Sequence, residues 1–301
     1  MQTHAIGASS LTCSRLAYGC WRLAGSEGGP RIESADAIRA VHAAFDAEFT
    51  LFDNADIYGR GECERIFGVA MREVPRMRQR IILATKCGIC PPWDGRTHCY
   101  DSSHQHIVAS VEGSLRRLGA DFVDLLMLHR PDYLGDPGEI ASAFAHLRSD
   151  GKVREFGVSN FRPSQLAALQ KSCTMPLVAN QVEVSLSALG CLDDGTLDSC
   201  IEKGVTPMAW SPLAKGRLLA SADDERGRWL HAHIQALAGE KGVAPAAIAL
   251  AWLLRHPARM IPIIGSTNPD HIRDAARADA ITLTREEWYS LLTAARGHPL
   301  P

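Results

Sequence analysis

The sequence predicts an α/β fold, a (β/α)8 TIM barrel with an N-terminal β-hairpin and extra helices near the C-terminus. Short apolar runs alternate with longer segments of helical periodicity, which is the pattern of βα units in a parallel sheet. Eight such runs follow a hairpin that we expect in residues 3–13. No linker composition interrupts the 301 residues, so we expect one domain over residues 1–301.

The eight apolar runs define the expected strands of the barrel. They lie near Leu16–Tyr18, Phe49–Phe52, Ile81–Ala84, Phe122–Leu128, Arg154–Val158, Leu177–Gln181, Val205–Ala209 and Met260–Ile263. A doubly wound dinucleotide-binding domain would instead need G-x-G-x-x-G after its first strand. Gly25, Gly28 and Gly29 do not supply that spacing, so the barrel is favoured.

The helices between these strands carry recognisable start and stop signals. One is expected after Ser34, and Gly151 and Gly204 stand where helices should end. Two helices fit between the seventh and eighth strands. The second of them opens at Pro245 and ends before Pro257.

Charge and hydropathy favour a small molecule as the partner. The 32 basic and 34 acidic residues give a formal charge of −2 without a long block of either sign, so we expect neither nucleic acid nor a membrane surface. No apolar run approaches the roughly 20 residues of a membrane span, and no secretion signal is recognised. We therefore expect a cytoplasmic protein.

The nine cysteines are expected to be reduced thiols, because an odd number without a secretion signal argues against a disulfide framework. Cys87 and Cys90 have C-x-x-C spacing, with His98 and Cys99 close behind. Pro91 and Pro92, which lie between Cys90 and His98, indicate a rim loop and not a zinc knuckle. Ordinary thiols and no bound metal are the preferred interpretation, with a zinc or thiol-redox role as the alternative.

Four residues suited to proton transfer follow three successive predicted strands. Asp53 and Tyr58 follow the first, Lys86 the second and His129 the third. Taken singly, each has a structural explanation, such as a turn cap or a surface charge. Together they lie at the C-terminal ends of barrel strands, where barrel active sites are built.

The chemistry of this set is that of carbonyl reduction. A phenol with a pKa of about 10 is a poor acid at neutral pH, so Tyr58 needs a cation to stabilise its anion. Lys86 is the candidate cation, and Asp53 can hold its charge inside the rim. His129 can hydrogen-bond the substrate oxygen.

Three long motifs resemble signatures of the aldo-keto reductase superfamily. Phe52–Gly59 resembles the tyrosine motif, Ser114–Leu118 through Asp124–His129 the second signature, and Gly151–Phe161 the third. His129–Asp132 and Trp21–Leu23 are most similar to a bacterial branch of soluble oxidoreductases. The resemblance implies a (β/α)8 barrel that uses NADP(H) to reduce aldehydes and ketones to alcohols, with Asp53, Tyr58, Lys86 and His129 catalytic and Tyr58 the proton donor.

The resemblance also implies the residues that bind the cofactor. Ser159, Asn160 and Gln181 would hydrogen-bond the nicotinamide carboxamide, and Trp210 would stack on the ring. The full implied set is Gly19, Ser159, Asn160, Gln181, Trp210, Ser211, Leu213, Gly216, Arg217, Gly265, Ser266, Asn268 and His271. Within it, Ser211 to Arg217 would pass over the pyrophosphate and Gly265 to His271 would meet the adenosine 2′-phosphate.

The 2′-phosphate loop departs from the family pattern. The family commonly offers a basic residue in the loop and an arginine a turn later, whereas this chain has Gly265, Asn268 and then His271. Ala275 replaces a common asparagine near the adenine. We expect NADPH because a helix N-terminus favours phosphate, with NADH as the alternative because a guanidinium is missing.

The expected substrate contacts are Trp21, Trp93 and Arg130, from loops at the pocket mouth. The leading hypothesis is an NAD(P)H-dependent aldehyde or ketone reductase. The alternative within the same family is a cofactor-binding, redox-sensing or regulatory subunit with slow turnover.

Overall fold

Eight parallel strands close into a barrel in the computed structural model, which describes residues 1–25, 32–95, 97–220 and 224–300. Around the ring they are β3 (Ala17–Gly19), β4 (Leu51–Asp53), β5 (Ile82–Cys87), β8 (Val123–Leu128), β9 (Val153–Ser159), β10 (Leu177–Glu183), β11 (Thr206–Trp210) and β12 (Ile261–Ile264). The last strand returns to the first, since Ile263 pairs with Ala17 and Ile264 with Tyr18. The predicted fold class is confirmed, and each strand lies within a few residues of its expected position.

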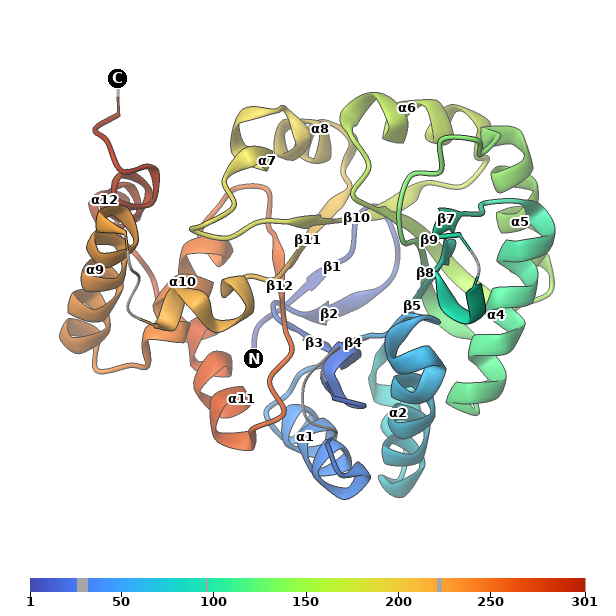
Figure 1. Cartoon of the computed structure of the whole chain (residues 1–301), viewed down its shortest axis with the longest axis horizontal. Coiled ribbons are helices and arrows are strands. Elements are labelled where there is room, and N and C mark those ends of the chain that lie inside the picture. The colour runs from blue at the N-terminus through green and yellow to red at the C-terminus, as the bar shows by residue number, and fades with distance from the viewer. Residues whose placement is uncertain (26–31, 96, 221–223, 301) are drawn as a thin grey trace.

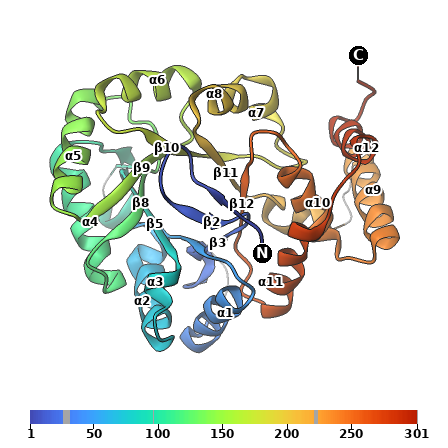
Figure 2. The ribbon, with the colours of Figure 1, turned by 180° about the vertical axis from the view of Figure 1, so that it is seen from behind.

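Helices surround the strands (Figure 1). In chain order they are α1 (Ser34–Asp46), α2 (Glu62–Glu73), α3 (Met77–Arg80), α4 (His104–Leu118), α5 (Pro137–Ser149), α6 (Pro163–Ser172), α7 (Gly190–Asp193), α8 (Thr196–Lys203), α9 (Glu225–Lys241), α10 (Pro245–Leu254), α11 (Pro269–Ala276) and α12 (Arg285–Arg296). In both views α9 and α12 lie beside each other, outside the ring (Figure 2). Of the helices described, none is singly long and apolar enough to cross a membrane; α9 and α10, bent by 96°, meet that test only as a pair.

Local sequence explains where several helices begin and end. Asp136 caps α5 by accepting a hydrogen bond from the Glu139 amide at 2.8 Å, with Pro137 at the first helical position. Gly204 ends α8 with a φ of 61°, a conformation that favours glycine. The two helices expected between the last strands are α9 and α10, and the predicted start at Pro245 is confirmed.

An N-terminal hairpin of β1 (Thr3–Ala5) and β2 (Thr12–Ser14) lies across the N-terminal mouth of the barrel (Figure 1). Its apolar residues Ile6, Leu11 and Cys13 are buried in one cluster with side chains of the barrel strands. The Gly7 amide donates a hydrogen bond to Thr206 Oγ1 at 2.7 Å, at the start of β11. The hairpin therefore closes the end of the barrel opposite the strand C-termini.

A second, short hairpin was not predicted. It consists of β6 (Ile89–Cys90) and β7 (Cys99–Tyr100), and follows directly after β5. The sequence analysis placed only a rim loop there. Two residues in each strand are too few to produce an alternating pattern, and in the observed register Ile89 pairs with Tyr100 and Cys90 with Cys99.

Candidate active site

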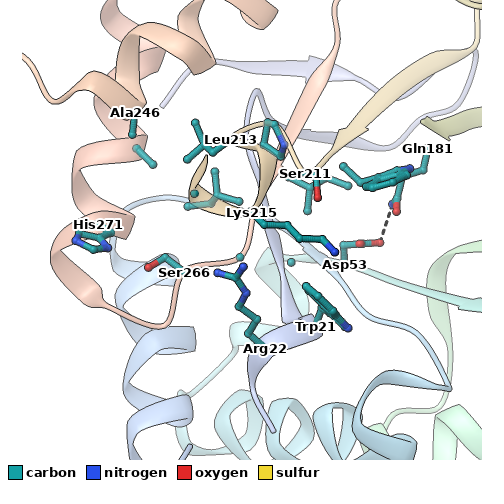
Figure 3. Close-up of a pocket in the computed structure, with 18 of the residues that line it drawn as sticks. Trp21, Arg22, Asp53, Gln181, Ser211, Leu213, Lys215, Ala246, Ser266 and His271 are labelled. Carbon is teal, nitrogen blue, oxygen red and sulfur yellow. Dashed lines mark hydrogen bonds between the residues drawn. The ribbon is translucent and has the colours of Figure 1, made fainter. Parts of the chain in front are cut away.

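A cavity of about 720 Å³ opens at the C-terminal ends of the barrel strands. Most of the residues predicted for the site line it, which are Gly19, Trp21, Asp53, Tyr58, His129, Arg130, Ser159, Asn160, Gln181, Trp210, Ser211, Leu213, Gly216, Gly265, Ser266 and His271. Figure 3 shows Asp53 and Gln181 at one end of the cavity and His271 at the other. The cavity is thus elongated and runs from the barrel centre to α11.

Asp53 and Lys86 form a buried ion pair at the barrel centre. Lys86 Nζ donates to Asp53 Oδ1 at 2.7 Å, to Asp53 Oδ2 at 2.8 Å and to the Asn54 carbonyl oxygen at 2.8 Å. Burial alone would lower the pKa of Lys86, but the charge of Asp53 and the hydrogen bonds of Asp53 and Tyr58 more than offset it and the pKa is raised. Lys86 therefore remains charged, and Asp53 separates it from the cavity wall.

Tyr58 lies beyond the end of β4, at the start of a tight turn. Gly59 and Gly61 in this turn have φ of 55° and 87°. A Cβ at Gly59 would lie 2.7 Å from Ala24 Cβ, so both conformation and space require glycine. The turn directs Tyr58 back over Lys86, whose Nζ lies 5.0 Å from the centre of the phenol ring.

Burial raises the pKa of Tyr58 to about 12, although the charge of Lys86 pulls it down. The sequence analysis expected Lys86 to bring this pKa below its ordinary value. Desolvation in the barrel outweighs the lysine in the structure. Tyr58 is consequently protonated at neutral pH, as a proton donor must be.

His129 follows β8 and faces Tyr58 across the cavity wall. The two rings are 5.7 Å apart between centroids, with an interplanar angle of 77°. Burial and the charges of Lys86 and Arg130 hold the pKa of His129 well below its ordinary value. The imidazole is therefore neutral and carries one N–H donor.

A hydrogen-bonded chain connects Asp53 to Trp210 along the cavity wall. Gln181 Nε2 donates to Asp53 Oδ1 at 3.1 Å (Figure 3), and Ser159 Oγ donates to the Gln181 carbonyl at 2.9 Å. Asn160 Nδ2 donates to Ser159 Oγ at 2.7 Å, and Trp210 Nε1 donates to Asn160 Oδ1 at 3.0 Å. Asn160 has a φ of 60°, which asparagine tolerates better than most residues. The chain fixes the orientation of four predicted cofactor residues.

The loop after β11 is folded into a succession of left-handed residues. Ser211, Ala214, Lys215 and Gly216 have φ of 51°, 49°, 58° and 92°. Two amides donate within the loop, from Ala214 to the Ser211 carbonyl and from Gly216 to the Leu213 carbonyl, both at 2.8 Å, so the turn is tightly closed. The loop lies at the middle of the elongated cavity, at Ser211 and Lys215 (Figure 3).

Sequence reasoning missed two cations of the cavity. Arg22 and Lys215 both line it, with the Arg22 guanidinium 5.7 Å and Lys215 Nζ 5.6 Å from the Trp21 ring centre. Arg22 stands inside the Trp21–Leu23 run, and Lys215 between two predicted loop residues. Their positions beside predicted site residues could therefore have identified them as lining residues. The other unpredicted lining residues are Pro212, Leu219, Ala244, Pro245, Ala246, Ile263, Ile264, Asp274 and Ala275.

Four predicted residues do not line the cavity. Trp93 lies under the guanidinium of Arg60, whose central carbon is 4.9 Å from the indole centre. Arg217 is exposed at the outer side of its loop. The Asn268 side chain caps α11 by accepting a hydrogen bond from the Asp270 amide at 2.9 Å. The fourth, Lys86, is fully buried and hydrogen-bonded to Asp53, so it would influence the site from behind the cavity wall.

The chain resembles known proteins along nearly its whole length. The model of the Aldo/keto reductase family matches residues 15–295. A protein named 6-dehydroglucose reductase from Novosphingobium aromaticivorans is 41% identical, with 98% of this chain and 96% of the relative covered. One of the same name from Agrobacterium fabrum is 42% identical, with 95% and 96% covered.

A solved structure agrees with the fold. The thermostable aldo-keto reductase Tm1743, in complex with the inhibitor epalrestat, superposes with a TM-score of 0.85 at 26% identity, over 98% of this chain and 100% of that one. The resemblance to a bacterial branch of oxidoreductases is thereby confirmed. On the family match, the near full-length relatives and the shared barrel, this chain belongs to the aldo-keto reductase family.

Proposed function

We propose that this protein reduces an aldehyde or ketone to an alcohol with NADPH, and that Tyr58 is the general acid. The observation that carries the proposal is the juxtaposition of Tyr58 and His129, with ring centroids 5.7 Å apart, on a cavity wall backed by the Asp53–Lys86 pair. A protonated phenol offers an O–H donor and a neutral imidazole an N–H donor, and both can reach one oxygen atom. That is the donor set that a carbonyl oxygen needs as it becomes an alkoxide.

The residues fit a nicotinamide dinucleotide. The cavity runs from Asp53 past the turn at Ser211 to His271 on α11, so it is elongated as an extended dinucleotide is. A Cβ at Gly19 would lie 2.9 Å from Ile263 Cγ2, so the wall is closely packed there. Asn160 and Gln181 would meet the carboxamide, with the Trp210 indole on one ring face. The bound cofactor supplies the hydride.

The proton is supplied by the chain's own residues. Tyr58 donates its hydroxyl proton to the carbonyl oxygen of the substrate, and its anion is then stabilised by the ammonium of Lys86. Asp53 keeps Lys86 charged and directs Nζ, at 2.7 Å. The N–H of His129 donates a hydrogen bond to the same substrate oxygen and so orients the carbonyl.

NADPH is proposed over NADH on the geometry of the α11 end. His271 and Ser266 line the cavity beside the start of α11, where the helix dipole favours a phosphate. Arg273 pairs with Asp270 at 2.6 Å, which holds its guanidinium on the outer face of the helix turn. His271 and the N-terminus of α11 would thus bind the 2′-phosphate in place of the arginine that the family commonly has.

For the substrate, we propose a small polar aldehyde, and 6-dehydroglucose as the first compound to test, because two relatives at 41% and 42% identity bear the name 6-dehydroglucose reductase. Trp21 and Arg130 line the substrate end of the cavity. An indole face packs on a sugar ring, and a guanidinium donates to hydroxyl oxygens.

The deciding experiment compares wild type with Tyr58→Phe on a panel of aldehydes and ketones that includes 6-dehydroglucose. The variant should bind NADPH as the wild type does, measured by tryptophan quenching, while kcat falls by roughly 10²- to 10⁴-fold. Undiminished turnover would remove Tyr58 from the mechanism. Tight NADPH binding by a wild type that turns over no carbonyl would instead favour the redox-sensing alternative.

A further inference from the structure

A cluster of thiols, an imidazole and a carboxylate lies at the base of the β6–β7 hairpin, away from the residues that line the cavity. The sequence analysis considered Cys87 with Cys90 and set a metal aside. In the structure Cys87 is fully buried, whereas Cys90 stands directly opposite Cys99 in the hairpin register. Donor atoms of Cys90, Asp101 and His106 all lie within 4.8 Å of one another.

We propose that Cys90, Asp101 and His106 bind one zinc ion, or a divalent cation of the same class, and that Cys99, opposite Cys90 in the hairpin, turns in as the fourth ligand. Thiolate sulfur, imidazole nitrogen and carboxylate oxygen are the ligands zinc takes, and four of them complete a tetrahedron. Cys90 Sγ lies 4.0 Å from His106 Nε2, and His106 Nδ1 lies 3.8 Å from Asp101 Oδ2. A zinc ion takes one imidazole nitrogen. The donor atoms of Cys90, Asp101 and His106 lie within 4.8 Å of one another, against roughly 3.3–3.8 Å around a bound zinc, so closing the site requires them to draw together by up to about 1.5 Å.

Hydrogen bonds hold Asp101 and His106 in place. His106 Nε2 lies 3.3 Å from Ser110 Oγ, so a zinc ion would bind Nδ1 or displace that hydroxyl. Asp101 Oδ1 accepts from the Ser103 amide at 2.9 Å, which leaves Oδ2 on the side of His106. The Asp101 amide donates to the Gly88 carbonyl at 3.1 Å and extends the hairpin. His106 is fixed in the first turn of α4, which Ser103 caps. A preorganised set of this kind is what distinguishes a binding site from a chance surface grouping.

A zinc ion binds the thiolate form of cysteine, so it must displace the thiol protons. The pKa of the Cys90 thiol is raised to about 11 by burial and by the neighbouring Cys99. Each zinc ion bound would release two thiol protons to the solvent, forming two zinc–sulfur bonds with no change of oxidation state. Occupancy should therefore fall as the pH is lowered.

The site would anchor the rim of the active site without entering it. The hairpin follows directly from Lys86 and Cys87 in β5, and the Ser102 amide beyond it donates to Asp132 Oδ2 at 2.9 Å. Asp132 stands two residues after Arg130, which lines the cavity. A bound ion would thus fix the hairpin against the start of α4, and the Ser102–Asp132 hydrogen bond joins this segment to the loop after β8.

The test is metal analysis of tag-free protein produced with added zinc and purified in a phosphine reductant without chelator. We expect about one zinc per chain, lost in Cys90→Ser and in His106→Gln. It should be retained in Cys173→Ser and Cys191→Ser, which alter half-buried thiols elsewhere. Zinc content that is equal in all five proteins, or that is absent from reduced wild type, overturns the proposal.

A second measurement does not depend on variants that fold. Alkylation of native wild-type protein, mapped by mass spectrometry, should slow at least tenfold at Cys90 and Cys99 when zinc is added, and not at Cys173. Equal rates with and without zinc would contradict the site. The site would also be contradicted if Cys90 and Cys99 form a disulfide in the purified protein and the protein binds no zinc once that disulfide is reduced.

Discussion

The Asp53–Lys86 ion pair limits which single substitutions can test the roles of the proposed catalytic residues. Both side chains are almost fully buried, so removing either leaves an uncompensated charge and costs about 3–5 kcal/mol of stability. Variants of this pair would mix unfolding with lost chemistry. Tyr58→Phe deletes one oxygen atom outside the pair, which is why it separates catalysis from stability more cleanly.

Asp56, two residues before Tyr58, makes stability depend on pH. Burial and the nearby Glu64 raise its pKa to about 7, and its Oδ1 has no hydrogen-bond partner among the described residues. Because this pKa lies above that of the unfolded chain, the proton's contribution to stability is fully present below about pH 4. It is lost as the pH rises through about 7.

Replacing Asp56 with Asn should therefore stabilise the protein at high pH. We expect the free energy of unfolding of the variant to overtake that of wild type between about pH 4 and 7, and to exceed it by about 2–4 kcal/mol at pH 8. Urea titrations at several pH values measure this. The exposed Asp121→Asn is the control, and a gain that does not vary with pH would contradict the assignment.

At the 2′-phosphate end, His271→Arg should separate the two cofactors. A guanidinium beside the start of α11 would add a charge-assisted hydrogen bond to NADPH only, so its Kd should fall roughly tenfold while that of NADH stays constant. Fluorescence titrations with both cofactors test this, with the remote His298→Arg as control. Equal tightening of both cofactors would show that this loop does not meet the phosphate.

Site residues that directly follow a strand could be predicted from the sequence. Site residues in loops could not, because whether they line the cavity depends on the direction in which the side chain points. Asp53, Tyr58 and His129 were found from strand ends, and they meet in the structure. Trp93 and Arg217 stand at plausible positions but point elsewhere, and one residue in a loop carries no periodicity to reveal this. The sign of the Tyr58 pKa shift also escaped prediction, because burial is a property of the closed barrel.

Among the elements, β9 and β10 approach too closely for any side chain at Gly157. A Cβ there would lie 2.7 Å from the Ala179 carbonyl oxygen and 3.2 Å from Met127 Cγ. Gly157→Ala should therefore cost about 1–3 kcal/mol of unfolding free energy in urea titrations. Gly190→Ala is the matched control, since nothing lies within 4 Å of its Cβ. A Gly157 variant as stable as that control would show that the strands separate at little cost.

Elements with strong local signals were predicted and those with weak signals were not. Start signals such as Pro245, and stop signals such as Gly204, gave helix ends because caps act within a few residues. The β6–β7 hairpin has only two residues in each strand, and the Asp101 amide extends it by one hydrogen bond to Gly88. Its sequence alone therefore resembled an irregular loop.

For the whole molecule, stability and catalysis should be separable at the two ends of the barrel. Ile6 is fully buried under the N-terminal mouth, opposite the cavity. Ile6→Ala should lower the free energy of unfolding by about 2–5 kcal/mol while leaving NADPH affinity unchanged. The exposed Thr12→Ala in the same hairpin serves as control. A loss of cofactor affinity in the Ile6 variant would mean that the two ends are coupled.

The pairing of β12 with β3 also sets an order of events during synthesis. β3 leaves the ribosome early, but the strand that completes its second edge is the last of the barrel. At about 5–20 residues per second, the stretch from Gly19 to Ile264 takes roughly 10 to 50 s to make. Through that interval the nascent sheet has two open edges and the cavity lacks a wall. The growing chain must therefore be kept from associating with its neighbours before it is able to hold a dinucleotide.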